Sequence, residues 1–298
     1  MKKILLLIIG AAVFLLVFLV GLDFMYTTIY SVAPPRTKFQ YFRSLKNQKV
    51  DYLFLGSSRV ESTINPEIIR AKTGKTAVNM GFQAAKLSDI YILLKLVKEY
   101  NIETDKIFIQ VDYIYNIEDG CSNVLPYQLM PFLRENQATK DYFELHYHQN
   151  KYLYYMPFYR YCYFENKIGF RELVSNMIHK KTTVVAHHGF YPLEGTSAQN
   201  GGALPNVITK SNKYYDAIKQ FAKKNKMDVV FFCAPFSKNN KNLSYVAKLK
   251  ERVPGLYNFA NLITDEKLFK DSYHLNKEGA ARFTEAFITK LVPPEQIK

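Results

Sequence analysis

The sequence predicts an α/β protein in three layers, an α/β/α sandwich around a parallel sheet. An N-terminal transmembrane helix precedes it and an aromatic-rich insertion interrupts it. Short apolar runs closed by glycine or proline alternate with segments of helical spacing, which is typical of such a sheet. A long uncharged run opens the chain, and the alternation stops in its middle. We therefore expect an anchor over 1–30, a basic juxtamembrane connector over 31–49, and an α/β domain over 50–298 with an insertion at about 116–205.

The N-terminal apolar run Ile4–Leu22 contains no charged residue. Its nineteen residues, at about 1.5 Å each, span ~28 Å, which matches the hydrocarbon core of a bilayer. A signal peptide would have a shorter core and a small-x-small cleavage site, and neither is present. We therefore expect an uncleaved signal anchor. Because Lys2 and Lys3 precede the run, the positive-inside rule predicts an extracytoplasmic domain, periplasmic or at the cell surface. The alternative is a buried core helix.

The connector and the whole chain are basic. Residues Arg36–Lys49 are predicted to face anionic lipid headgroups, or else to form an ordinary solvated surface. The chain has 40 Lys and Arg against 26 Asp and Glu, a net charge of +14. This charge favours polyanions such as nucleic acid, lipid headgroups or charged wall polymer. The sequence contains no recognisable nucleic-acid module, and an extracytoplasmic location argues against that partner.

Four short apolar runs predict the strands of the sheet. They are Val50–Leu55, Thr76–Met80, Lys106–Val111 and Asp228–Cys233. Helical spacing predicts three covering helices, Ser88–Tyr100, Tyr214–Lys226 and Gly279–Leu291. Strands that alternate with helices indicate a parallel sheet that is covered on both faces.

The insertion is unusually aromatic. From Tyr142 to Phe164, eleven of twenty-three residues are Tyr or Phe. This density predicts stacking surfaces for sugar rings or a docking face for a membrane partner. The alternative is that the rings form a small core of the insertion itself.

No pattern in the sequence indicates a metal or a nucleotide cofactor. The pairs His146 and His148, and His187 and His188, lack the carboxylate-containing spacing of a His-Glu-x-x-His motif. The three cysteines form no Cys-x-x-Cys pair. Neither a phosphate-binding loop nor a Gly-x-Gly-x-x-Gly motif follows the first strand. We therefore expect neither a metal nor a cofactor.

The residues after the first predicted strand, Gly56-Ser57-Ser58-Arg59, are the first candidates for a functional site. In open α/β sheets, ligands bind beyond the carboxyl ends of the strands. A serine on a strand-to-helix turn has an exposed hydroxyl, and the first N–H groups of the helix can stabilise an oxyanion beside it. Ser58 is the predicted nucleophile. Ser57 is an alternative nucleophile, and an ordinary turn serine is the alternative role.

A matching base and carboxylate occur near the C-terminus in Asp271-Ser272-Tyr273-His274. An aspartate at this spacing can accept from one imidazole nitrogen and leave the other free to take a serine proton. Together with Ser58, these residues predict a catalytic triad of Ser58, His274 and Asp271. The alternative for His274 is a helix-capping or core histidine.

These segments resemble the conserved blocks of the SGNH, or GDSL, hydrolase superfamily. Leu55-Gly56-Ser57-Ser58 is similar to the first block, with Ser57 where the family usually has aspartate and Ser58 at the nucleophile. The segment 271–280 is similar to the last block, whose Asp-x-x-His completes the triad. Gly81 resembles the glycine of the second block, whose N–H contributes to the oxyanion hole. The resemblance covers about 50–115 and 210–291.

The third block of the family departs from its usual form. It normally ends in Gly-x-Asn-Asp, and its asparagine donates to the oxyanion, whereas this chain has Gln110-Val111-Asp112-Tyr113. The resemblance then implies an oxyanion hole made by the N–H groups of Ser58 and Gly81, with Asn79 as a compensating donor. Losing one donor typically costs about 10²- to 10³-fold in rate. The site is therefore expected to be slow, specialised for a transfer partner, or inactive.

Two charged residues flank the predicted site. Arg59 either binds a phosphate or carboxylate of the substrate or forms a structural ion pair with a residue such as Glu61. Asp112 is a second possible substrate contact. Because a carboxylate would repel a developing oxyanion, Asp112 is otherwise expected to point elsewhere or to be protonated.

The resemblance implies three alternative functions. The first is a membrane-anchored extracytoplasmic serine esterase or O-acyltransferase, acting on ester-linked acyl groups of a cell-surface polysaccharide or wall polymer. Anchored members of the superfamily often work beside a membrane-bound O-acyltransferase. The second is a catalytically inactive fold that binds glycan or serves as a scaffold for such an acyltransferase. The third is a lipid esterase at the membrane surface.

Overall fold

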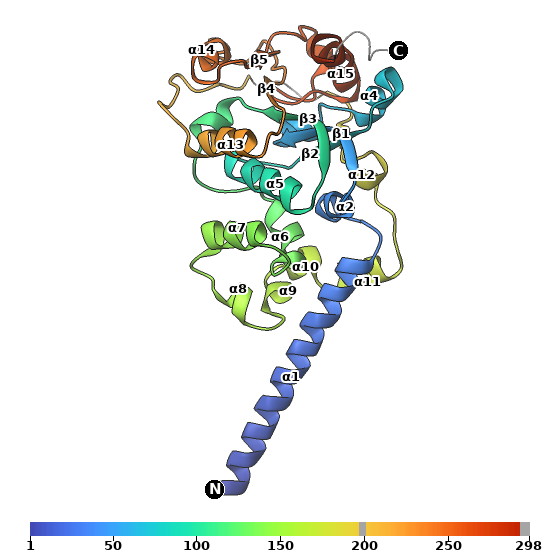
Figure 1. Cartoon of the computed structure of the whole chain (residues 1–298), viewed down its shortest axis with the longest axis vertical. Coiled ribbons are helices and arrows are strands. Elements are labelled where there is room, and N and C mark those ends of the chain that lie inside the picture. The colour runs from blue at the N-terminus through green and yellow to red at the C-terminus, as the bar shows by residue number, and fades with distance from the viewer. Residues whose placement is uncertain (197–200, 293–298) are drawn as a thin grey trace.

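The computed structural model describes residues 1–196 and 201–292. Its centre is a parallel sheet with the strand order β2-β1-β3-β4-β5 (Figure 1). The strands are β1 (Lys49–Gly56), β2 (Ala77–Gly81), β3 (Glu103–Gln110), β4 (Val229–Cys233) and β5 (Tyr257–Asn258). The four predicted strands are confirmed. The sequence did not predict β5, because it has only two residues and both are exposed.

The order of the strands creates a switch point beside β1. From β1 the chain goes to β2 on one side and then crosses to β3 on the other side. Open sheets of this order bind ligands outside the carboxyl end of the strands at that point. The turn that follows Gly56 therefore lies where the fold favours a functional site.

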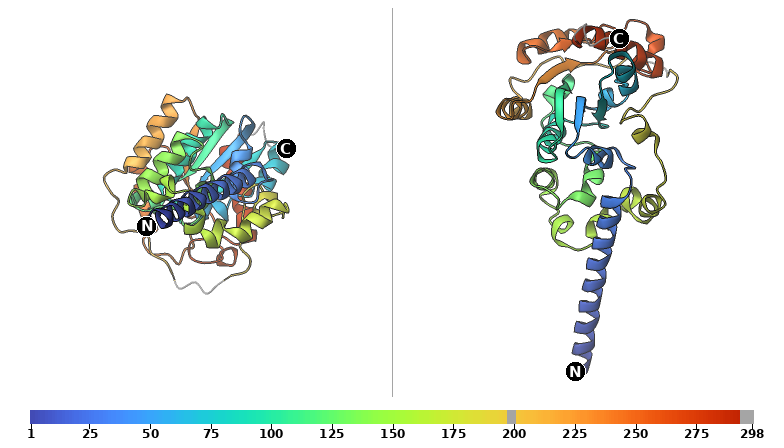
Figure 2. Two further views of the ribbon diagram at one scale, coloured as in Figure 1. Left: turned by 90° about the horizontal axis from the view of Figure 1, so that it is seen from below. Right: turned by 45° about the vertical axis from the view of Figure 1, so that its right-hand side comes forward.

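Helices cover both faces of the sheet, which confirms the three-layer α/β/α architecture (Figure 2). On one face lie α2 (Lys38–Ser44), α5 (Leu87–Glu99) and α13 (Lys213–Lys224), with α14 (Ser244–Arg252) toward β5. On the other face lie α4 (Pro66–Thr73) and α15 (Lys277–Leu291). Leu53 and Leu55 of β1 point into the first layer, and Tyr52 and Phe54 point into the second.

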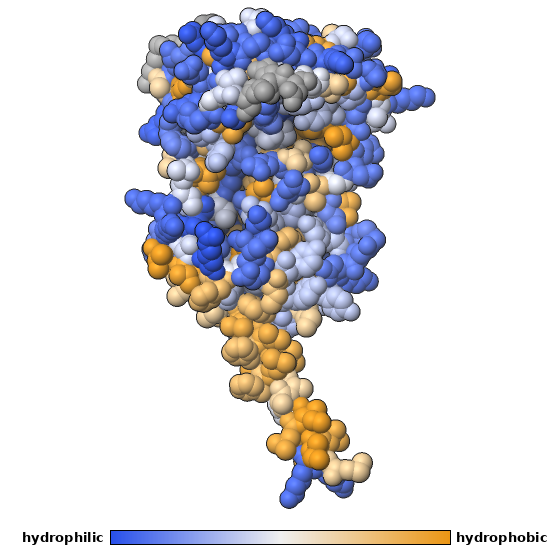
Figure 3. Space-filling view, turned by 180° about the vertical axis from the view of Figure 1, so that it is seen from behind, coloured by the Kyte–Doolittle hydropathy of each residue, from blue (hydrophilic) through white to orange (hydrophobic). Residues whose placement is uncertain are grey.

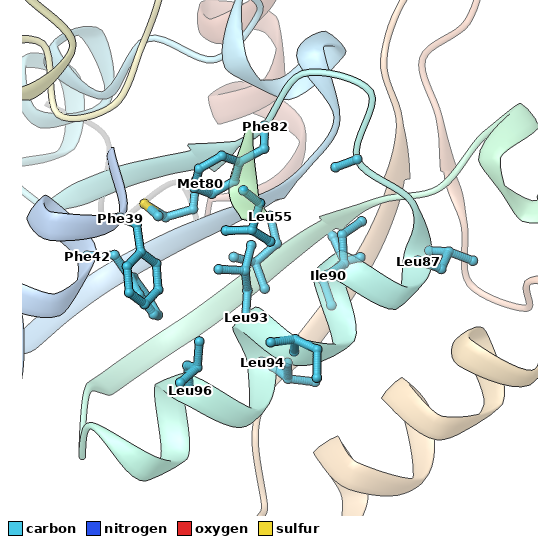
Figure 4. Packing of buried hydrophobic residues seen from close by; sticks show 14 of the residues in the cluster. Phe39, Phe42, Leu55, Met80, Phe82, Leu87, Ile90, Leu93, Leu94 and Leu96 are labelled. Carbon is cyan, nitrogen blue, oxygen red and sulfur yellow. The ribbon is translucent and has the colours of Figure 1, made fainter. Parts of the chain in front are cut away.

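The larger core lies between the sheet and α5. Ile90 and Leu93 of α5 are fully buried against Leu55 and Met80 of the sheet (Figure 4). The spacing of the apolar residues along α5 follows the helical period, so one face of the helix meets the sheet. This packing fixes the carboxyl ends of β1 and β2 relative to each other.

The basic connector is folded into the domain. Phe39 and Phe42 lie three residues apart on α2, and both are fully buried in the larger core. Lys38 is 2% exposed, and Arg36 is also buried. The expectation that this stretch faces headgroups or solvent is therefore wrong for these residues. Thr37 caps α2 by accepting from the N–H of Gln40, so this helix begins only a few residues after the end of α1.

The N-terminal helix α1 (Lys2–Val32) projects from the domain (Figure 1). It is the only helix in the described part of the chain that is long and apolar enough to cross a membrane. Its apolar residues from Ile4 to Val20 are exposed except for the half-buried Leu19, so the alternative of a buried core helix is wrong. The helix continues past the apolar run, and there Tyr26 and Tyr30 are buried against the domain.

The insertion is helical and packs against the C-terminal end of α1, the end that is nearest to the sheet. Its helices are α6 (Leu125–Leu129), α7 (Gln137–Tyr147), α8 (Tyr152–Tyr155), α9 (Tyr159–Tyr163), α10 (Glu165–Ile168), α11 (Phe170–Met177) and α12 (Thr183–Ala186). Short 3-10 helices are η1 (Tyr113–Asn116), η2 (Met130–Phe132) and η3 (Glu266–Leu268). Tyr142 and Tyr161 are buried, so part of the aromatic cluster is a local core, as one alternative predicted. Other rings, such as Tyr155, are exposed.

Candidate active site

The strand-to-helix turn after β1 separates the two adjacent serines. Ser57 is buried, its N–H and its hydroxyl both lie 2.8 Å from Gln110 Oε1, and its Oγ accepts from the N–H of Arg59. Ser57 thereby caps α3 (Ser58–Glu61). Ser58 is the first residue of α3 and is partly exposed. The alternative nucleophile Ser57 is thus held inside the fold, whereas Ser58 faces a cavity.

Gly56 makes this turn possible. A Cβ on Gly56 would lie 2.3 Å from Val60 Cγ2 and 2.7 Å from Gln110 Oε1. A side chain at this position would therefore displace α3 and the amide that holds Ser57.

Ser58, His274 and Asp271 lie in one hydrogen-bonded chain. Ser58 Oγ is 2.8 Å from His274 Nε2, and His274 Nδ1 is 3.0 Å from both Asp271 carboxylate oxygens. Asp271 Oδ1 also accepts from the backbone N–H groups of Tyr273 and His274 at 2.8 and 2.9 Å. These bonds fix the carboxylate beside the ring. The geometry has the order nucleophile, base and orienting carboxylate that nucleophilic catalysis requires.

The Asp271 carboxylate remains ionised in this arrangement. Partial burial raises its pKa, but the hydrogen bond and charge of His274 and two backbone N–H groups outweigh that effect, and the net pKa falls to about 2. An ionised carboxylate can accept from His274 Nδ1 at all ordinary pH values.

We expect Asp271 to contribute stability that is lost between about pH 4 and pH 2. Its folded-state pKa of about 2 lies below the ordinary value of about 3.9, so the unfolded chain binds more protons in this window and stability falls as pH falls. The carboxylate is 43% exposed, and solvent screening therefore keeps the effect small. The measurement is the melting temperature of the wild type minus that of Asp271→Asn, followed across this window. A difference that does not change with pH would contradict this.

Gly81 and Asn79 are committed to bonds within the fold. The N–H of Gly81 donates to Asn79 Oδ1 at 3.0 Å, and Asn79 Nδ2 donates to the carbonyls of Val60 and Ile64, each at 2.8 Å. The expectation that the Asn79 amide compensates as an oxyanion donor is therefore wrong. Instead, Asn79 ties the end of β2 to α3. The N–H of Ser58 belongs to the first turn of α3, where donors have no partner within the helix.

A cavity of about 380 Å³ opens beside the Ser58 hydroxyl. It is lined by Ser58, Glu61, Ser62, Gln83, Tyr191, Leu193, Lys270, Asp271 and His274. The sequence interpretation did not include Gln83 or Lys270, which bring an amide donor and a cation to this cavity. Gln83 lies two residues after Gly81, and Lys270 directly precedes Asp271, so proximity to the motifs was the available signal.

Arg59 and Asp112 form an ion pair that is fully buried. The guanidinium group of Arg59 lies 3.4 Å from the ring centroid of Phe236. It also donates to three backbone carbonyls, those of Tyr273, Ala234 and Pro235. Neither charged group is accessible to a substrate here. The expectation of substrate contacts from Arg59 and Asp112 is corrected to a structural role.

The Arg59 side chain connects three parts of the site. It starts from the nucleophile turn, reaches the carbonyls after β4, and bonds to the carbonyl of Tyr273 beside His274. Asp112 accepts from Arg59, from the Gln110 amide and from the N–H of Ile114. The pair therefore fixes the distance between the turn that carries Ser58 and the loop that carries His274.

Glu61, which the sequence offered as a partner for Arg59, pairs instead with Lys38 at 2.8 Å. Lys38 also donates to the carbonyl of Gly81 at 2.6 Å. Burial lowers the pKa of Lys38, and the Glu61 carboxylate opposes that shift. Since Lys38 begins α2, the first helix after α1 is attached directly to Glu61 in the wall of the Ser58 cavity.

The other candidate histidines do not line the Ser58 cavity. His187 Nδ1 is 3.1 Å from Glu67 Oε1, and His188 Nδ1 is 2.9 Å from the Tyr41 hydroxyl. Burial lowers the pKa of His146 to about 4. Within residues 1–196 and 201–292, no group of three His, Cys, Asp or Glu side chains is arranged to hold a metal ion.

Comparison of this chain with protein-family models and with curated proteins gives no match. The arrangement of Ser58, His274 and Asp271 is therefore the main guide to the chemistry of this chain. The carbonyl-attack chemistry of such a site requires a nucleophile, a base and an oxyanion donor.

Proposed function

We propose that this chain is a membrane-anchored serine esterase or O-acyltransferase that acts on ester-linked acyl groups of a cell-surface polysaccharide or wall polymer. The observation that carries the proposal is the contact of Ser58 Oγ with His274 Nε2 at 2.8 Å, with Asp271 behind the ring. An ordinary turn serine is not expected to contact one nitrogen of a histidine whose other nitrogen is hydrogen-bonded to a carboxylate.

In the proposed reaction, Ser58 Oγ attacks the acyl carbonyl carbon while His274 Nε2 takes the hydroxyl proton. Asp271 holds the proton on Nδ1 and stabilises the imidazolium that forms. His274 then returns a proton to the leaving alcohol, and the acyl group remains on Ser58. Attack by water gives hydrolysis, and attack by a sugar hydroxyl gives transfer.

The oxyanion of the proposed intermediate faces the start of α3. The N–H of Ser58 supplies one donor, and the positive end of the first helical turn favours negative charge there. Gln83 lines the same cavity and carries a side-chain amide, so it supplies the second donor in this proposal. This assignment replaces Asn79, whose amide is bonded elsewhere.

The proposed location follows from α1. A helix of this length and composition can hold the domain at a membrane, and the lysines at its start support a location of the domain outside the cytoplasm. There it would meet acylated surface glycans and, as a proposed partner, a membrane-bound O-acyltransferase. No nucleic-acid partner is proposed.

A second candidate function is an inactive fold that binds glycan or acts as a scaffold for the acyltransferase. The internal hydrogen bond of the Gly81 N–H favours it, because this bond occupies the donor that the SGNH resemblance implies for the oxyanion hole. Under this alternative, Ser58→Ala leaves the phenotype of the cell unchanged.

The proposal predicts that a fluorophosphonate probe labels Ser58 of the full chain in nanodiscs. Peptide mass spectrometry identifies the modified residue. The label is expected to disappear in Ser58→Ala and to remain on Ser58 in the matched variant Ser57→Ala, because Ser57 faces Gln110. No label on Ser58, under conditions that label a control esterase, would contradict the enzymatic proposal and favour the inactive fold.

The same preparation distinguishes the possible substrates. Release of acetate from acetylated oligosaccharides supports the glycan substrate, and transfer to an added glycan supports an O-acyltransferase. Preference for detached long-chain esters would instead support the lipid esterase.

A further inference from the structure

Exposed apolar side chains of the insertion gather where the domain meets α1. We call this set the rim, and it consists of Tyr152, Tyr155, Met156, Phe170, Met177 and Ile178. Tyr155 is 73% exposed, and Phe170 and Ile178 are each 67% exposed. Figure 3 shows apolar side chains at this end of the folded body, next to the apolar helix. Large exposed apolar groups that cluster in this way usually mark an interaction surface.

The part of the rim on α11 is an outward-facing apolar stripe. Phe170, Val174, Met177 and Ile178 have the spacing of one helical face; Phe170, Met177 and Ile178 are exposed, and Val174 is half-buried. The buried residues of α11, Leu173 and Asn176, lie along one side of this stripe. A surface helix normally turns such a stripe toward the core. Here the residues at both ends of the stripe point away from the protein. Such residues are stabilised when another apolar environment covers them.

The Tyr152–Met156 part of the rim lies at the level where the apolar run of α1 ends, and the α11 part begins beside Tyr30, about 12 Å farther along the helix. Pro157, which follows Met156, lines a cavity together with Val20 and Phe24 of α1. The N–H of Phe158 donates to the Asp23 carboxylate at 2.9 Å, and the Phe158 ring lies 4.9 Å from that of Tyr26. At about 1.5 Å per residue, these contacts fall within ~6 Å of Leu22, the last residue of the apolar run.

The insertion is fixed to α1 by buried polar contacts. Asp23 pairs with Arg160 at 2.7 Å, and these side chains are 6% and 2% exposed. The hydroxyl of Tyr30 donates to the carbonyl of Ile168 at 2.9 Å. Because these contacts fix the insertion relative to α1, the depth of α1 in a bilayer also sets the depth of the rim.

Exposed basic residues border the rim in sequence. Lys151 precedes Tyr152, Arg171 follows Phe170, and Lys180 and Lys181 come soon after Ile178. Apolar and tyrosine side chains flanked by lysine and arginine are typical of segments that lie at a membrane surface. There the rings enter the interface, and the cations meet anionic headgroups.

We propose that the rim is inserted into the interfacial layer of the same bilayer that α1 crosses. The insertion then contacts the lipid surface around α1, and we call the insertion in this position the collar. The continuity of the rim with the apolar surface of α1 favours lipid over a protein partner as the occupant. The collar holds the domain at a fixed height above the membrane. This inference requires α1 to cross the bilayer and is independent of the chemistry at Ser58.

The absence of tryptophan from the chain allows a direct test by fluorescence. Single-tryptophan variants Tyr155→Trp and Phe170→Trp report on the rim. Phe14→Trp reports on the apolar part of α1, and Tyr257→Trp is the matched exposed control on β5, far from α1 (Figure 1). Each full chain is reconstituted in vesicles of phosphatidylcholine and phosphatidylglycerol, with and without bromine on the acyl chains.

Bromolipid is expected to reduce the emission of the two rim tryptophans and of Phe14→Trp by about twofold or more, with emission shifted to the blue. Emission from Tyr257→Trp should stay unchanged. Quenching of Phe14→Trp without quenching of the rim variants would overturn the proposal and favour a protein partner as the occupant. Unquenched Phe14→Trp would also overturn it, because α1 would then not enter the bilayer. The melting temperature of each variant checks that its fold is retained.

Discussion

Replacing His274 by alanine is expected to slow the acylation of Ser58 by between about 10⁴- and 10⁶-fold. His274 Nε2 is the group 2.8 Å from Ser58 Oγ, so the variant removes the base that takes the hydroxyl proton. A serine hydroxyl without such a base is a weak nucleophile at neutral pH. The expectation rests on the proposed function and concerns the chemical step rather than binding.

The measurement is the rate of fluorophosphonate labelling, with the site of the label identified by mass spectrometry. His187→Ala is the matched control, because His187 is also a partly exposed histidine hydrogen-bonded to a carboxylate, that of Glu67, but it does not line the Ser58 cavity. We expect this control to label at the wild-type rate. Equal labelling of His274→Ala and wild type would mean that His274 is not the base, and the proposed mechanism would fail.

The sequence predicted those parts of the fold that depend on local patterns. Apolar runs such as Val50–Leu55 form strands because both faces of the sheet are covered, so the local pattern and the final burial agree. The nucleophile turn and the Asp271–His274 pair were predictable for a similar reason. In each, the important residues are neighbours in the chain, and their spacing decides their geometry.

The parts that the sequence did not predict depend on distant partners. Lysine is usually a surface residue, yet Lys38 is buried. Its ammonium group pairs with Glu61 and donates to the carbonyl of Gly81. Such partners are brought together only by the packing of α2 on the sheet. Burial of a lysine is favourable only when its charge is paired and hydrogen-bonded, and the sequence cannot show that pairing.

The prediction that Asn79 donates to the oxyanion hole was wrong because it, too, depends on distant partners. Asn79 lies close to Gly81 in the sequence, but the direction of its amide is set by the carbonyls of Val60 and Ile64. Arg59 was assigned two alternative roles because its partner Asp112 lies on another strand end. The motif located the site, and long-range hydrogen bonds determined which of its polar groups remain available.

Replacing Asp112 by alanine is expected to lower the free energy of unfolding by about 3–5 kcal/mol. The variant leaves the guanidinium group of Arg59 buried without its carboxylate, although three carbonyls and the Phe236 ring still contact it. Removal of one partner of a buried pair is costly, because the remaining charge has lost its compensation in a region of low dielectric constant.

Glu285→Ala is the matched control for this prediction. Glu285 pairs with Lys72 at 3.6 Å on the surface, where both side chains are 50% exposed, so its removal should cost no more than about 1 kcal/mol. Denaturant unfolding of the full chain in detergent, followed by near-ultraviolet circular dichroism of its tyrosines, measures both variants. Equal loss in the two variants would contradict a structural role for the buried pair. A larger loss for Asp112→Ala would show that the residue at the altered third block stabilises the turn on which Ser58 depends.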